Sequence, residues 1–320
     1  MTRRNVLRRF LLLLFTAAFL AVSVSCSGKE GDDGVQIDIS DPVGGSSIVT
    51  ADDLVAFVEK GEGNTAILQN NIDLDRDMLK LTRTRGDFTI EGNGFTITGS
   101  GDCVIRLEDK MKLTLNDVTI VGGYDGIGAL GDCTISGNNA TVKGVANAAN
   151  CIGLLTIGNK SNLTFLTQEG SGAIARGVTL SEGALLNASG GMGGITSTDG
   201  DVTLTASSYL NAQTDKNYNA LQCARTLVLM DGCTLKVTNN DLYHGAEANT
   251  LSVEGAVTIE ASGGEKGAGL FIYTLNDDVR ILGSCIPEAR FENGNGSIMF
   301  VDSIEDLATP TPEPTETPED

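Results

Sequence analysis

The chain has no tryptophan, one histidine, and only two prolines outside its last residues. A single histidine, His244, excludes a zinc-protease helix, which needs two histidines. The absence of tryptophan removes the preferred platform for stacking sugar rings. Four of the six prolines lie between 309 and 320, so only Pro42 and Pro287 interrupt the rest. A body nearly free of proline is typical of hydrogen-bonded strands.

Basic residues are also scarce, because 22 Lys and Arg face 42 Asp and Glu, for a net charge of −20. Such a charge argues against nucleic acid and anionic polymers as direct partners. Divalent cations could screen it, and we note three acidic pairs that could hold Ca²⁺: Asp199 with Asp201, Asp215 with Asp241, and Asp277 with Asp278. No loop has a complete calcium spacing. We therefore expect no metal site and no cofactor. We interpret the acidic pairs as solvated carboxylates in turns, and calcium binding is the alternative.

Nine three-residue segments share one pattern: the first and third residues are apolar, and the middle residue is usually Thr. These segments recur every 20 to 28 residues. They are Phe88-Thr89-Ile90, Leu113-Thr114-Leu115, Cys133-Thr134-Ile135, Leu155-Thr156-Ile157, Val178-Thr179-Leu180, Val202-Thr203-Leu204, Leu227-Val228-Leu229, Leu251-Ser252-Val253 and Val279-Arg280-Ile281. The outer residues of each triplet share one face of a strand. A fixed period of this length indicates a stacked solenoid.

A second, weaker strand follows within most units, as in Phe95-Thr96-Ile97, and is reached through a bend that contains Gly or Asn. The pattern predicts an all-β parallel β-helix of about nine coils over residues 48–305. A leucine-rich horseshoe would need a regular leucine frame and helices. A β-sandwich would need hairpins in place of one constant frame.

An open solenoid needs a cap over its end coil. Thr50 and Asp53 resemble a capping box, and Leu54, Phe57 and Val58 follow at helical spacing. We expect a short helix that covers the first coil, with a surface helix elsewhere as the alternative.

The N-terminal part of the body resembles the opening of right-handed parallel β-helix proteins of the pectate-lyase-like superfamily. The resemblance rests on the predicted helix, on residues 67–68 and 72–74, and on the stretch 89–97. The resemblance covers residues 48–300. It implies a right-handed coil. It leaves function open, because that superfamily includes polysaccharide lyases, hydrolases, adhesins and binding modules.

The N-terminus resembles a bacterial lipoprotein signal. Four arginines between residues 3 and 9 precede an apolar run over 10–24, and Ser25 is followed by Cys26. This order predicts a signal peptide over 1–25, lipidation of Cys26, and a flexible tether over 26–47. Ser23 departs from the usual Leu, so an ordinary signal peptide or an uncleaved anchor remains an alternative. The Pro/Thr/Glu-rich tail covers 306–320. The predicted location is extracytoplasmic, on a bacterial cell surface, anchored through the lipid.

Catalytic motifs are missing, and we expect no catalytic residue. Arg176 and Arg225 share a frame two coils apart, but no carboxylate constellation matches the calcium site of a polysaccharide lyase. A lyase or glycoside hydrolase acting on an acidic polysaccharide is kept as an alternative function.

One candidate ligand site stands out. Tyr218 and Tyr243 fall at matching places in successive units, with Asp215, Asp241 and His244 beside them. Two tyrosines on neighbouring coils could stack sugar rings. The alternative is a structural aromatic stack that closes a turn.

We therefore predict a monomeric, adhesin-like surface protein without catalysis, which binds a polysaccharide or another surface component. A passive spacer is the third alternative.

Cysteine positions suggest buried thiols. Cys151 and Cys223 share a frame three coils apart, and Cys233 and Cys285 share another two coils apart. Neither pair is within disulfide reach, so we expect most of these cysteines to be free core residues.

Overall fold

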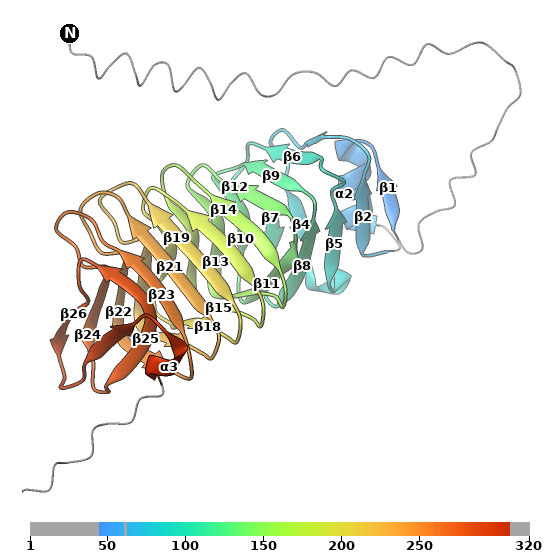
Figure 1. Ribbon diagram of the computed structural model, residues 1–320. Coiled ribbons are helices and arrows are strands. Elements are labelled where there is room, and N and C mark those ends of the chain that lie inside the picture. Colours follow the sequence, from blue (N-terminus) through green and yellow to red (C-terminus); the bar gives the residue numbers. More distant parts are fainter. Residues whose placement is uncertain (1–44, 61–62, 308–320) are drawn as a thin grey trace, which may run out of the picture. The chain divides into compact units, whose positions relative to one another are not determined.

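The computed structural model describes residues 45–60 and 63–307, which form an all-β parallel solenoid of about ten turns (Figure 1). All strand pairs are parallel and join coil to coil. The larger sheet holds β1 (Ser46–Ile48), β2 (Thr65–Leu68), β4 (Leu79–Leu81), β5 (Phe88–Glu91), β7 (Cys103–Leu107), β8 (Met111–Asn116), β10 (Asp125–Ala129), β11 (Cys133–Asn138), β13 (Asn147–Ile157), β15 (Ser171–Leu180), β17 (Gly193–Ser197), β18 (Val202–Leu204), β20 (Leu221–Leu229), β22 (Ala246–Val253), β24 (Leu270–Thr274) and β26 (Arg290–Asn293).

The second sheet has eleven strands. They are β3 (Ile72–Asp73), β6 (Thr96–Gly99), β9 (Thr119–Gly122), β12 (Ala140–Lys143), β14 (Asn162–Leu166), β16 (Leu185–Ser189), β19 (Tyr209–Thr214), β21 (Thr234–Asn239), β23 (Thr258–Ser262), β25 (Val279–Ile286) and β27 (Ile298–Val301). Helices α2 (Ala51–Lys60) and α3 (Ile304–Leu307) and the 3-10 turn η1 (Arg83–Arg85) complete the described chain.

Each coil has three sides. Side A carries the apolar-Thr-apolar triplets and includes β5, β8, β11 and β18, and side B is the eleven-stranded sheet. Side C includes β7, β10 and β17 and runs on into side A of the next coil, so that long strands such as β13 and β20 serve both sides. The register of these strands shifts where they bend from C to A, between Cys151 and Leu154 and between Cys223 and Thr226.

The core is the column of apolar side chains inside the coils. In triplets such as Val178-Thr179-Leu180 the outer residues are buried and the middle one is partly exposed, as the strand period requires. Phe88 and Phe165 are among its largest fully buried side chains. The predicted fold class and the inward facing of the triplets are therefore confirmed.

Two details of the predicted frame are wrong. Cys133 pairs with Met111 and not with Leu113, so the third triplet is displaced by two residues from the second. The ninth triplet, within Val279–Ile281, belongs to β25 on side B and not to side A. A two-residue shift keeps every side chain on its face, and alternation looks the same on every side, so the sequence pattern could not reveal either difference.

The capping box is present at α2. The Thr50 backbone N–H donates to Asp53 Oδ2 over 2.9 Å, and the Asp53 N–H donates to Thr50 Oγ1 over 3.1 Å. These bonds lower the pKa of Asp53. Leu54, Phe57 and Val58 are buried, and the Phe57 ring lies 5.9 Å from that of Phe88. The helix therefore covers core side chains of the first coils.

Several predictions concern residues outside the described ranges. The signal peptide over 1–25, the lipidation site Cys26, most of the tether over 26–47 and most of the tail over 306–320 lie there. Within residues 45–60 and 63–307, no helix combines the length and the apolar character that a membrane crossing requires.

Gly137 is a testable point of close coil packing. Its φ is +128°, and a Cβ there would meet the backbone of Leu115 on the preceding coil. We expect Gly137→Ala to lower the free energy of unfolding by about 1–3 kcal/mol, measured by urea unfolding. The matched control is Gly128→Ala, whose Cβ would lie 3.3 Å from Cys103 Sγ, a side-chain atom. Equal losses in both variants would contradict the steric account.

Candidate binding site

Tyr218 and Tyr243 lie where side B turns into side C. Tyr218 is in the loop between β19 and β20, and Tyr243 is in the loop between β21 and β22. Leu221 pairs with Ala246, so counting back along both strands places the two tyrosines at matching positions on neighbouring coils. They are 45% and 49% exposed. The structure thus places the two tyrosines on adjacent coils, about 4.8 Å apart along the solenoid axis.

The same position on the preceding coil is occupied by Met192. Ile195 pairs with Leu221, and counting back from this pair places Met192 beside Tyr218. Met192 is 47% exposed. We call Met192, Tyr218 and Tyr243 the corner strip. Sequence reasoning missed Met192 because its loop resembles neither tyrosine loop, and only the strand register shows the match.

Asparagine side chains hold these loops. Asn239, which is buried, donates through Nδ2 to the Tyr218 carbonyl oxygen over 2.6 Å. Asn219 Oδ1 accepts the His244 backbone N–H over 3.1 Å. Asn240 Nδ2 donates to Asp215 Oδ1 over 2.7 Å, across the two coils. The backbone under the tyrosines is therefore fixed before any ligand arrives, which lowers the entropic cost of binding.

The tyrosine rings do not stack on each other. Within residues 45–60 and 63–307 the ring pairs are Phe57 with Phe88, His244 with Phe271, and Phe271 with Tyr273. Asp215 and Asp241 lie in the two consecutive tyrosine loops, as the sequence predicts.

The His244 side chain contacts the next coil. Its Nδ1 accepts the Ala268 backbone N–H over 2.8 Å, and its ring stacks on Phe271 with centroids 4.5 Å apart. Burial lowers its pKa, because desolvation disfavours the imidazolium. The histidine therefore joins two coils, and its role toward a ligand stays a prediction.

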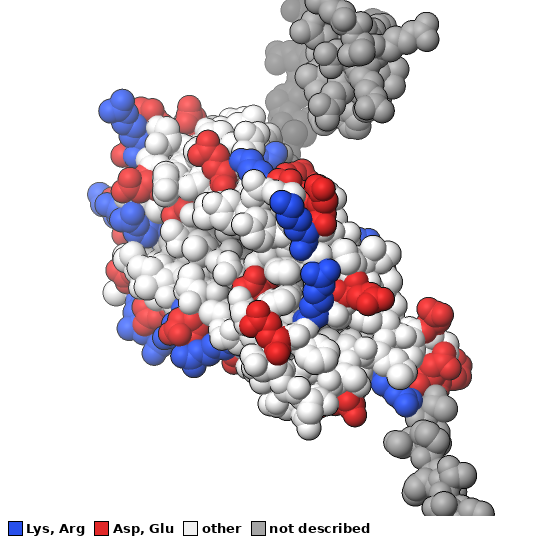
Figure 2. Space-filling view, turned by 90° about the vertical axis from the view of Figure 1, so that its left-hand side faces the viewer, with Lys and Arg blue, Asp and Glu red and all other residues white. Residues whose placement is uncertain are grey.

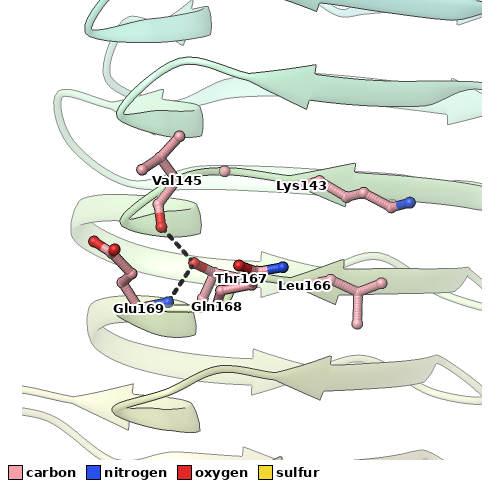
Figure 3. A pocket seen from close by; sticks show the side chains of 7 residues that line it. Lys143, Val145, Leu166, Thr167, Gln168 and Glu169 are labelled. Atoms are coloured by element: carbon pink, nitrogen blue, oxygen red, sulfur yellow. Dashed lines mark hydrogen bonds between the residues drawn. The ribbon is translucent and has the colours of Figure 1, made fainter. Parts of the chain in front are cut away.

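A hollow of about 450 Å³ opens on the same corner nearer the N-terminus (Figure 3). It is lined by the ends of β12 and β14 and the loops after them, and we call it the Thr167 hollow: Lys143, Gly144, Val145, Leu166, Thr167, Gln168 and Glu169. The Thr167 hydroxyl donates to the Val145 carbonyl oxygen over 2.8 Å and accepts the Glu169 backbone N–H over 3.4 Å.

Lys216 connects the hollow to the corner strip. It belongs to the Tyr218 loop, and its Nζ donates to the Gln168 carbonyl oxygen over 2.8 Å. Hollow and strip are therefore parts of one surface along the corner.

A smaller hollow of about 190 Å³ lies on side C, next to this corner. Tyr124, 65% exposed, stands at its edge, and Arg106 and Asp125 also line it. Asp125 is buried, and its two carboxylate oxygens accept Asn147 Nδ2 and Asn150 Nδ2, each over 2.8 Å. The local sequence around Tyr124 resembles that around the other two tyrosines. The two asparagines that bond the neighbouring Asp125 come from the next coil.

The remaining titratable groups are scattered. Arg176 pairs with Asp132 over 3.6 Å, and Arg225 pairs with Asp199 over 3.1 Å, on the surface. In the described ranges, no three His, Cys, Asp or Glu side chains gather closely enough to hold a metal ion.

Comparisons with known proteins give little. No family model matches the chain, and no curated protein matches it. Among solved structures, the protein is similar to the one titled "L. reuters 100-23 SRRP", with a TM-score of 0.47 and 12% identity over 80% of this chain and 95% of that chain.

The His244 contact predicts a pH dependence of stability. Because the folded pKa lies below the ordinary 6.5, the unfolded chain binds the proton more readily. Stability is then full above pH 6.5 and falls as the pH drops from there through the folded pKa. We expect the urea midpoint to decrease between pH 7 and pH 5 by more in the parent than in His244→Asn, which keeps an acceptor for the Ala268 N–H but does not titrate. Identical decreases would contradict this account.

Proposed function

We propose that this protein is a non-catalytic binding protein for an extended polysaccharide, which lies along the corner between sides B and C. The observation that supports the proposal is the corner strip, three large apolar side chains on successive coils, each about half exposed. Exposed aromatic residues in line with a hollow are unusual on a surface without a ligand.

The chemistry of the corner suits sugars. Tyrosine rings offer apolar faces for the C–H side of a pyranose, and their hydroxyls remain free to bond in water. The Thr167 hollow adds Lys143, Gln168 and Glu169, whose polar groups can bond sugar hydroxyls. The repeat of one platform per coil fits a ligand that also repeats, which favours a polymer over a single small molecule.

The charge of the chain favours a neutral polymer. The net charge is −20, and Figure 2 shows basic and acidic side chains mixed over one face, with broad uncharged areas between them. An acidic polysaccharide would be repelled at long range, and the face shown in Figure 2 has no broad basic area that would reverse this.

We further propose that the protein is displayed outside the cytoplasm through a lipid on Cys26. Support comes from the basic, apolar and small-residue order before that cysteine. In a bacterial host, Cys26→Ser is expected to abolish incorporation of labelled fatty acid and to move the protein from the membrane to the soluble fraction. Unchanged labelling would contradict lipidation at Cys26.

The binding proposal is tested on a glycan array with the purified chain. We expect retention of neutral polysaccharides, and we expect Tyr218→Ala with Tyr243→Ala to weaken it by at least tenfold, because stacking on two rings is lost. Far-UV circular dichroism should not change, since both side chains are about half exposed. Tyr273→Ala is the matched control, because Tyr273 is also exposed but lies on β24, away from the strip.

Other outcomes separate the alternatives. Retention that survives the double variant would exclude the strip as the site. No retention of any glycan would favour a passive spacer. New reducing ends, or absorbance from an unsaturated product when acidic polysaccharide and Ca²⁺ are added, would favour a hydrolase or a lyase.

A further inference from the structure

Two cysteines meet inside the bend between sides C and A. Cys133 begins β11, and Cys151 ends the side C part of β13. Their Sγ atoms are 3.6 Å apart, and each residue is 4% exposed. In the described part of the chain, these are the two thiols that contact each other: Cys103 Sγ instead meets Met78 Sδ, and Cys223 and Cys285 contact carbonyl oxygens.

The strand register explains why they meet. Cys151 pairs with Ala129, and Cys133 pairs with Leu155, so the two cysteines sit on opposite flanks of one bend in consecutive coils. Cys151 lies before the bend in its coil and Cys133 lies after the bend in the neighbouring coil, and both side chains are buried. A comparison of positions within one frame misses this contact, because the residues occupy different sides of the solenoid.

The geometry is close to that of a cross-link. A disulfide needs its sulfurs about 2.05 Å apart, so the two atoms must approach by about 1.6 Å. Both residues lie beside a bend and not in the middle of a paired strand. A shift of this size therefore disturbs fewer ladder hydrogen bonds.

The pair is also chemically asymmetric. The Cys133 thiol donates to Cys151 Sγ, which lowers the pKa of the Cys151 thiol, while this bond and burial raise the pKa of Cys133. Cys151 is therefore the better nucleophile, since the thiolate is the reactive form.

We propose that Cys133 and Cys151 are a modification site that closes to an intramolecular disulfide when the protein meets a disulfide oxidant, either a small-molecule disulfide or a thiol–disulfide oxidoreductase. The inference is independent of the proposed ligand. It agrees with the proposed location, because disulfides persist outside the cytoplasm.

The reaction balances as two exchanges. The Cys151 thiolate attacks one sulfur of the oxidant, a mixed disulfide forms, and the first thiolate leaves. Cys133 then loses its proton to that leaving thiolate, and its sulfur attacks Cys151 Sγ, which releases the second thiolate to take up the proton that Cys151 lost. The two protein thiols are oxidised by two electrons, and the oxidant disulfide is reduced to two thiols.

The test uses the folded full chain with oxidised glutathione, followed by alkylation without reduction and trypsin digestion. Trypsin cleaves after Lys112, Lys143 and Lys160, so Cys133 and Cys151 fall in separate peptides. We expect one cross-linked pair of these peptides, absent from Cys133→Ser and Cys151→Ser. Cys223→Ser, another buried cysteine, is the matched control and should keep the cross-link.

Thermal unfolding gives a second readout. Closing this loop is expected to raise the melting temperature of the oxidised parent by about 5–10 °C over the reduced parent. Cys151→Ser should show no such difference between oxidising and reducing conditions. Full alkylation of both cysteines after oxidation, or a glutathione adduct on Cys151 that never resolves, would overturn the proposal.

Discussion

The structure depends on in-register stacking of parallel strands from one coil to the next. Backbone hydrogen bonds join each strand to its neighbours above and below, and the apolar outer residues of each triplet close the interior. Because the ladder fixes every strand, a residue on one side has a defined neighbour one coil away. Differences in coil length must then be taken up at the corners, where the ladder is interrupted.

We propose that this division gives stability to the sides and ligand recognition to the corners. On the sides, the outer residues of a triplet such as Val202-Thr203-Leu204 are buried, and its middle residue, a β-branched threonine, points outward. At the corner between sides B and C, loops carry Met192, Tyr218 and Tyr243 at matching positions on successive coils. Polar backbone groups of these loops are tied by Asn219 and Asn239, so the exposed side chains stand on a rigid base.

The sequence predicts the fold and two of the three residues of the corner strip. A period of two residues identified eight triplets on side A and several strands of side B, because burial of one face of a strand produces an alternating apolar pattern in the sequence. It could not show that Cys133 pairs with Met111, or that Val279 lies on side B, because alternation reports which way a side chain points and not its partner. Tyr218 and Tyr243 were found for the same reason that Met192 was missed: the first two share similar phrases, whereas the third matches them only through the register.

Contacts that form at the bends cannot be predicted by aligning the repeats of the sequence. The ring of His244 turns toward Phe271 because its Nδ1 accepts a backbone N–H from the next coil, a bond that no local pattern encodes. Cys133 and Cys151 meet because one bend brings the end of side C over the start of side A. Both cases have the same physical origin: a solenoid stacks like on like along its sides, but at its corners it places unlike residues from successive coils together. Chemistry that needs two different groups, whether a thiol pair or an aromatic ring above a polar hollow, is therefore expected at the corners of this fold rather than on its sides.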